Sequence, residues 1–198
     1  MGWSCSWIAV RGKEPAALLT ALGMHLLQER EEFPESPWTA ASLRAGWFLV
    51  FCSNHCDPAR FKNSVLTDLS ADCELVHSSV EEHVMYSSAA YWRHGKQVWE
   101  IVHDAQKEIY HLHTSGDLPA YFFHIRPQVF AEQEAEGGAT ADVDLIFDIP
   151  LQVGAELTGF RHDHACPADA ADPDQANPYQ VVLLDERSPG AKPWWKVW

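Results

Sequence analysis

The chain has 198 residues, of which 46% are hydrophobic and 21% charged, as is usual for a globular protein with its own core. It has no run of about 18 apolar residues, so no transmembrane helix is expected. The net charge of −14 disfavours direct binding to DNA or RNA, because a negative field repels phosphate backbones.

The opening residues and the cysteines predict a cytoplasmic protein. The start lacks the basic leader of a secretory signal, and Arg11 and Lys13 cut its apolar stretch short. The cysteines number five and follow no disulfide framework spacing. Reduced thiols in the cytoplasm are therefore the expected state.

The first quarter of the chain predicts a strand, a helix and a second strand. SWIAVRG at 6–12 reads as a strand that Gly12 ends. Leucines at helical spacing then predict a helix within 13–31, with Pro15 in its first turn. The continuous apolar run in 42–54 predicts a strand covered on both faces.

The middle of the chain predicts a helix and then a series of strands. Asp57 as N-cap and Pro58 as the first helical residue start a helix over 57–72. Residues 73–113 read as three or four strands, with Arg-His-Gly-Lys at 93–96 as a hairpin turn. The last of these strands, within 108–114, would place His111 and His113 on one face.

The last third mixes helices, loop and a final strand. A helix is expected around 118–125 and should break or kink at Pro127. Residues 143–147 read as a short extended run, followed by a helix that starts at Asp148 and ends at Gly159. Residues 161–178 read as a polar loop, and 181–185 as the last strand.

Together these elements predict an α+β fold. We expect a mostly antiparallel sheet with helices packed on it, and a βαβα start followed by a β-meander. No linker or repeat divides the chain, so residues 1–198 are expected to form a single domain. Within it, 127–186 is an acidic, loop-rich C-terminal part and 187–198 is a tail.

The acidic residues are unevenly spread along the chain. Residues 1–126 have a net charge of −5, residues 127–186 of −12 and residues 187–198 of +3. A field of this sign attracts cationic partners and also keeps a protein soluble. This asymmetry is the main functional clue in the sequence.

Clustered histidines raise the possibility of a metal site. Zinc is held by imidazole and thiolate ligands, and two pairs could supply them, namely His111 with His113 and His162 with His164. Asp163 could orient an imidazole from behind. The spacing matches no established zinc motif, and the alternative is a loop that caps the preceding helix. We therefore expect no cofactor, with zinc as the alternative.

The sequence contains few signals for other kinds of site. The sequence has no nucleophile-elbow, P-loop or dinucleotide-binding motif. Cys56 precedes the expected helix at 57–72, where the helix dipole could lower the pKa of its thiol. The C-terminal Trp194, Trp195 and Trp198 could anchor a partner, since aromatic residues dominate binding hot spots; the alternative is that the tail packs on its own domain.

These observations favour a non-enzymatic protein-binding module with an acidic surface. The expected partner is another protein of basic character, as for an immunity or inhibitor protein that neutralises a cationic toxin. The alternative is a metal-dependent enzyme that uses His111, His113, His162, Asp163 and His164. A third possibility is self-association through the tail. Segments such as DIPLQVGAELTGFRHD and the WWK terminus are similar to those of small bacterial proteins, a resemblance that implies no activity.

Overall fold

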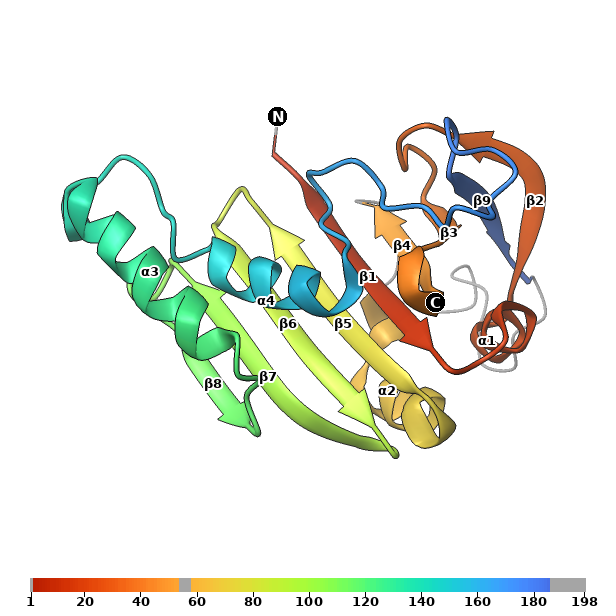
Figure 1. The fold of residues 1–198 in the computed structure, drawn as a ribbon, viewed down its shortest axis with the longest axis horizontal. Helices are drawn as coiled ribbons and strands as arrows, with labels where there is room; N and C mark the ends of the chain where they lie inside the picture. The colour runs from red at the N-terminus through yellow and green to blue at the C-terminus, as the bar shows by residue number, and fades with distance from the viewer. Residues whose placement is uncertain (1, 54–57, 186–198) are drawn as a thin grey trace, which may run out of the picture.

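A nine-stranded antiparallel sheet forms the centre of the protein. The computed structural model describes residues 2–53 and 58–185. The sheet order is β2-β9-β3-β4-β1-β5-β6-β7-β8 (Figure 1). The strands are β1 (Ser4–Arg11), β2 (Met24–Glu31), β3 (Trp38–Ser42), β4 (Trp47–Ser53), β5 (Glu74–Glu81), β6 (Tyr86–Arg93), β7 (Lys96–Asp104), β8 (His113–Gly116) and β9 (Tyr179–Leu184).

Four α-helices complete the described part of the chain: α1 (Pro15–Leu22), α2 (Asn63–Leu69), α3 (Phe122–Ala135) and α4 (Asp148–Thr158). The protein is therefore an α+β protein with 29% helix and 37% strand, as the sequence predicts. The order in which the elements follow each other is different from the expected one. Three strands, β2 to β4, lie between the first two helices, so the chain does not begin βαβα.

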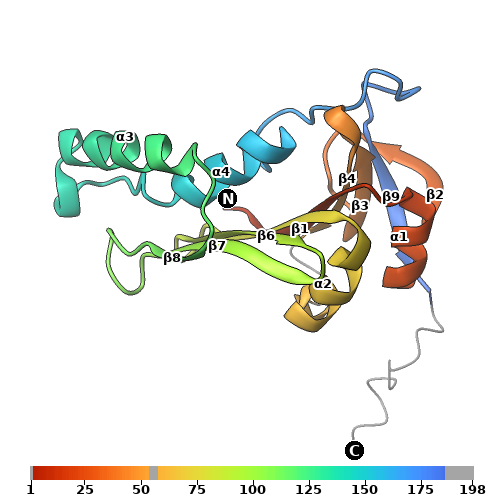
Figure 2. The same cartoon turned by 60° about the horizontal axis from the view of Figure 1, so that its bottom comes forward.

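The helices cover both faces of the sheet. Side chains alternate along a strand, so Trp7 and Ala9 of β1 face one side while Ile8 and Val10 face the other. Helices α1 and α2 pack on the side of Ile8 and Val10. Helix α4 and the segment that follows it cover the other side, with α3 beside α4 (Figure 2). This explains the continuous apolar runs at 7–10 in β1 and 47–52 in β4.

The expected helix over 13–31 is only half helical. Helix α1 ends at Leu22, and Gly23 takes a left-handed conformation with φ of 64°. The next residues form the edge strand β2, which pairs with β9 from the other end of the chain. Helical spacing of the leucines continues past Gly23, so the period alone misses this long-range pairing.

The run at 42–54 also hides a turn. Ala45 and Gly46 have φ of 57° and 74°, and they separate β4 from β3. Strands β3 and β4 then pair with each other in an antiparallel hairpin. The strand prediction is correct for β4, but β3 was not predicted.

Strands β5, β6 and β7 each pair with the next strand in the chain, so β5 to β8 form a meander. The predicted turn at 93–96 is present, with φ of 54° at His94 and 68° at Gly95. Strand β8 contains only 113–116, so the strand expected over 108–114 is wrong for most of its length. His111 consequently lies in the loop before β8.

The last two helices agree in part with the expectations from the sequence. Helix α3 continues through Pro127, which lies inside the helix on its exposed side. Helix α4 begins at Asp148 and is followed by left-handed Gly159, as predicted. Residues 143–147 are turns and irregular structure rather than a strand.

The described cysteines are in two states. Cys5, Cys73 and Cys166 are free thiols. Cys52 is disulfide-bonded, so the expectation that all thiols are reduced is wrong for this residue. Among the described helices, none is both long enough and apolar enough to cross a membrane.

Candidate functional site

Acidic side chains are concentrated in the layer that covers one face of the sheet. We call residues 117–178, which contain α3, α4 and the loop after α4, the acidic layer (Figure 2). The acidic layer contains 12 Asp and Glu residues and two basic residues, Arg126 and Arg161, which gives a net charge of −10. The charge piled up in the sequence therefore becomes a charge on one side of the fold.

The opposite layer is electrically balanced. We call residues 13–23 and 58–73, which contain α1 and α2, the neutral layer. It has three acidic and three basic residues and so no net charge. The two segments that cover opposite faces of the sheet therefore differ in net charge, although Asp169 and Asp172 lie at the sheet edge beside Pro15 of α1.

Some carboxylates of the acidic layer form ion pairs within the protein. Arg161 donates to Asp163 from Nε at 2.7 Å and to Asp148 from Nη2 at 2.8 Å. Burial alone would raise the pKa of Asp163, but the hydrogen bonds and charge of Arg161 outweigh it and lower that pKa. Arg30 of β2 reaches Asp172 at 2.7 Å. These pairs fasten the loop after α4 to the rest of the fold.

The remaining carboxylates of the acidic layer have no cationic partner of this kind. Among the described residues, no basic side chain lies within ion-pair distance of four exposed acids of this layer, which are Glu132, Glu136, Asp142 and Glu156. They lie on α3, at its end, in the connection to α4 and on α4. Their charge is open to solvent and to a partner.

The two histidine pairs have different surroundings. His111 lies in the loop before β8, and its carbonyl oxygen accepts a hydrogen bond from His103 Nδ1 at 2.7 Å. His113 is exposed at the start of β8, and His164 is exposed in the loop after α4. Within residues 2–53 and 58–185, no three His, Cys, Asp or Glu side chains form a group that could hold a metal ion.

His103 is buried and links two segments of the chain, a role that the sequence does not predict. Its Nε2 lies 2.8 Å from Asp144 Oδ2, while its other ring nitrogen holds the loop of His111. His103 thereby joins β7 to the connection between α3 and α4. Its role in the structure is to hold these segments together.

His162 is the most enclosed of the candidate residues. Its side chain is 1% exposed, and its Nε2 lies 3.3 Å from Glu82 Oε1 at the end of β5. The ring of Trp3 contacts the imidazole edge-on, with 5.8 Å between centroids. Burial lowers the pKa of His162, although Glu82 and Asp163 act in the opposite direction. A neutral imidazole is therefore favoured near pH 7.

The contacts of Glu82 and Trp3 with His162 could not be predicted from the sequence. They lie about 80 residues or more from His162 in the chain, and no local spacing relates them. Sheet pairing brings them together, since β1 and β5 are neighbours and the Trp3 amide donates to Glu82 Oε2 at 2.7 Å. The capping-loop expectation for 162–166 accordingly misses the contact that buries His162.

His162 lies in the wall of a cavity of about 450 Å³ between the loop after α4, the connection from β2 to β3, and Trp3. Cys166 also lines this cavity, but burial raises the pKa of its thiol to about 11, so it is protonated near neutral pH. A thiolate nucleophile is thus not available here.

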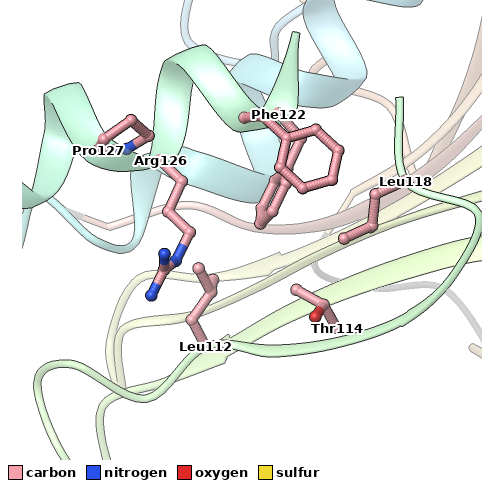
Figure 3. A pocket seen from close by; sticks show the side chains of 7 residues that line it. Leu112, Thr114, Leu118, Phe122, Arg126 and Pro127 are labelled. Carbon is pink, nitrogen blue, oxygen red and sulfur yellow. The ribbon is translucent and has the colours of Figure 1, made fainter. Parts of the chain in front are cut away.

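A second cavity, of about 370 Å³, lies between β8 and α3. Figure 3 shows Leu112, Leu118 and Phe122 around it, with the Arg126 side chain extending from α3 toward Leu112. Arg126 also lies over the ring of Phe130, at 4.7 Å. This cavity is largely apolar and contains no pair of groups suited to acid–base or nucleophilic chemistry.

Two expected features lie outside the described residues. These are Cys56 before the expected helix and the tryptophans of the tail, Trp194, Trp195 and Trp198. Comparison of the chain with protein-family models, curated proteins and solved structures gave no match. The function is therefore argued from the described residues alone.

Proposed function

We propose that the protein is a non-enzymatic protein-binding module whose acidic layer docks a cationic partner protein. The observation that carries this proposal is the one-sided charge: −10 on the acidic layer and none on the neutral layer. A charge gathered on one face steers an oppositely charged partner into a defined orientation. An immunity or inhibitor protein that neutralises a basic toxin is one concrete form of this function.

The four unpaired carboxylates named above are the best candidates for partner contact. Their positions on α3, α4 and the connection between them give a surface built on regular elements, which fixes the geometry of the charges. Exposed charges chiefly raise the association rate and lose their effect as salt increases. Binding should therefore be salt-dependent.

We propose a cytoplasmic, single-domain protein that contacts neither nucleic acid nor membranes. The negative charge supports the exclusion of nucleic acid, because phosphate would be repelled. Three free thiols support a reducing compartment, whereas the disulfide at Cys52 points to an oxidising one. Thiol titration of protein taken from its native compartment, under denaturing conditions, distinguishes these alternatives.

Affinity purification with the tagged full chain tests the proposed function. It compares the wild type with two double variants of equal charge change, both on helices or their ends. Glu136→Gln with Glu156→Gln alters the acidic layer, and Glu14→Gln with Asp68→Asn alters the neutral layer. We expect a basic protein to be retained by the wild type and the neutral-layer variant at about 50 mM salt, and to be lost at about 500 mM.

The acidic-layer variant should retain at least about tenfold less of this protein at low salt. Equal retention by both variants would contradict the proposal, as would the absence of any basic protein. Circular dichroism of both variants confirms that they are folded.

The metal-dependent enzyme formed by His111, His113, His162, Asp163 and His164 has weaker support. These residues come from two separate segments, one at the start of β8 and one after α4, and the described part of the chain contains no group able to hold a metal. Elemental analysis of purified protein, with His162→Ala and His164→Ala variants, tests this alternative. A stoichiometric metal that disappears in either variant would favour the enzyme over the binding module.

A further inference from the structure

The cavity beside His162 has the features of a binding site for one side chain. The connection from β2 to β3 and the loop after α4, which lie together at the upper right of Figure 1, form its walls. Aromatic rings supply much of the lining, from Trp3, Phe33 and Tyr179. Phe33 is 58% exposed, so its ring is open to a partner.

One acceptor in the wall of this cavity, His162 Nδ1, lacks a donor. Since Nε2 of His162 faces Glu82, its proton lies on that nitrogen and Nδ1 is left with a lone pair. Nδ1 is buried and has no hydrogen-bond partner among the described residues. The nearest charged atom is Asp163 Oδ1 at 3.9 Å, which cannot donate and is too far for a hydrogen bond. Buried acceptors are seldom left without a donor.

The lining of the cavity suits a cation. Glu32 and Asp163 contribute carboxylates, while among the described residues no lysine or arginine lines it. Arg161 binds Asp163 through two hydrogen bonds, and the exposed Glu32 forms no ion pair with any described residue. Aromatic rings beside carboxylates attract guanidinium groups, which stack on ring faces and donate several hydrogen bonds at once.

We propose that this cavity receives an arginine side chain of the cationic partner, with its guanidinium N–H groups directed at His162 Nδ1 and Asp163. This inference rests on the proposed function and adds an anchor point to it. The charge of the acidic layer would draw the partner in, and the cavity would fix its register. Anchors of this kind, an aromatic-lined pocket filled by one arginine, carry a large share of binding energy in protein interfaces.

Titration of the full chain with N-acetyl-arginine amide tests the proposal, with N-acetyl-citrulline amide as the uncharged control of the same shape. Nuclear magnetic resonance of the His162 imidazole follows binding. A single side chain should bind saturably with a dissociation constant of about 1–10 mM, and the citrulline compound should bind at least about tenfold more weakly.

Two variants with matched controls locate the site. His162→Gln should weaken binding of the arginine compound at least about tenfold, whereas His83→Gln, at an exposed histidine that contacts Glu81, should not change it. Phe33→Ser should weaken it at least about fivefold and leaves the buried core intact. Phe123→Ser, at an exposed phenylalanine of α3, is its control.

Equal binding of both compounds, no binding up to about 50 mM, or wild-type affinity in Phe33→Ser would overturn the proposal. These results differ from failure of the proposed function. A cationic protein that still binds through the acidic layer while the arginine compound does not would reject only the cavity assignment. Binding of the arginine compound with no salt-dependent protein partner would reject the docking function instead.

Discussion

The acidic layer and the neutral layer both cover the central sheet with apolar side chains, yet they differ in charge. Phe160 and Val153 are fully buried in the acidic layer, as Leu18 and Leu66 are in the neutral layer. The neutral layer shows that this sheet can be covered without any net charge. The negative charge of the acidic layer is therefore not a requirement of packing, which makes a role in recognition or solubility the remaining explanation.

Buried polar contacts hold the connection between α3 and α4 in the acidic layer. Buried Gln133 of α3 donates to the carbonyls of Gly138 and Val143 and accepts from the amide of Leu145. Ser87 of β6 donates to the carbonyl of Phe147 at 2.6 Å. Such contacts fix the connection between α3 and α4, so the charges on it are held in place rather than on a loose loop.

The largest expected effect concerns the apolar anchor of the acidic layer. The ring of Phe160 lies 5.2 Å from that of Trp7 and 6.2 Å from that of Phe51. Phe160→Ala should lower the free energy of unfolding by about 3–5 kcal/mol, because it leaves a cavity in the core. Leu66→Ala in the neutral layer should cost about 2–5 kcal/mol. Urea denaturation measures both.

Phe123→Ala provides the control for Phe160→Ala, since this ring is 61% exposed and its loss should change stability by less than about 0.5 kcal/mol. A cost below about 1 kcal/mol for Phe160→Ala would mean that the acidic layer is not anchored at this point.

The next largest effect on the free energy of unfolding is expected at Gln133, whose side chain hydrogen-bonds to the connection between α3 and α4. Gln133→Leu keeps the size of the side chain but removes its three hydrogen bonds, so it should lower the free energy of unfolding by about 2–3 kcal/mol. Gln128→Leu, at an exposed position of the same helix, should change it by less than about 0.5 kcal/mol. Faster amide exchange at Leu145 in Gln133→Leu would locate the loss. Equal stability of the two variants would show that the connection does not depend on Gln133.

A smaller, pH-dependent effect on stability is expected from a histidine on the neutral-layer side of the sheet. His77 of β5 points to the side of the neutral layer and contacts Phe61, with 5.7 Å between ring centroids. Burial lowers the pKa of His77 to about 4. Because the unfolded chain binds this proton more readily, stability should be full above pH 6.5 and fall as the pH drops from 6.5 toward 4.

The loss at His77 should be about 1–3 kcal/mol over that interval. Denaturation at pH 7.5 and 4.5 measures it, and His77→Gln should flatten the pH dependence, whereas His83→Gln at an exposed position should not. A wild-type pH profile identical to that of His77→Gln would place the acid-sensitive group elsewhere.

The sequence predicts the parts of the fold that local rules determine. Strand β1, the turn at His94–Gly95 and the end of α4 at Gly159 follow from apolar runs and from glycine in left-handed conformation. Strand β2 was missed because its partner β9 is distant in sequence. Strand β3 was missed although it forms a hairpin with β4, the next strand; its other partner is the distant β9. Leucine spacing in 13–31 fits a helix equally well, and only pairing with β9 decides the outcome.

Of the features of the candidate site, the sequence predicted only the negative charge. Counting residues identified the acidic segment, but not that it would cover one face while α1 and α2 stay neutral. His162 was identified as a candidate, but its contacts with Glu82 and Trp3 were not predicted. These contacts arise from sheet order, which single-sequence spacing does not contain.

The salt dependence of partner binding tests the central claim most directly. The measurement is the dissociation constant of the basic partner recovered by affinity purification, between about 50 and 500 mM salt. We predict at least about tenfold weakening with salt for the wild type and for Glu14→Gln with Asp68→Asn. Glu136→Gln with Glu156→Gln should bind more weakly at low salt and depend less on salt. Binding that ignores salt, or equal curves for the two double variants, would contradict docking through the acidic layer.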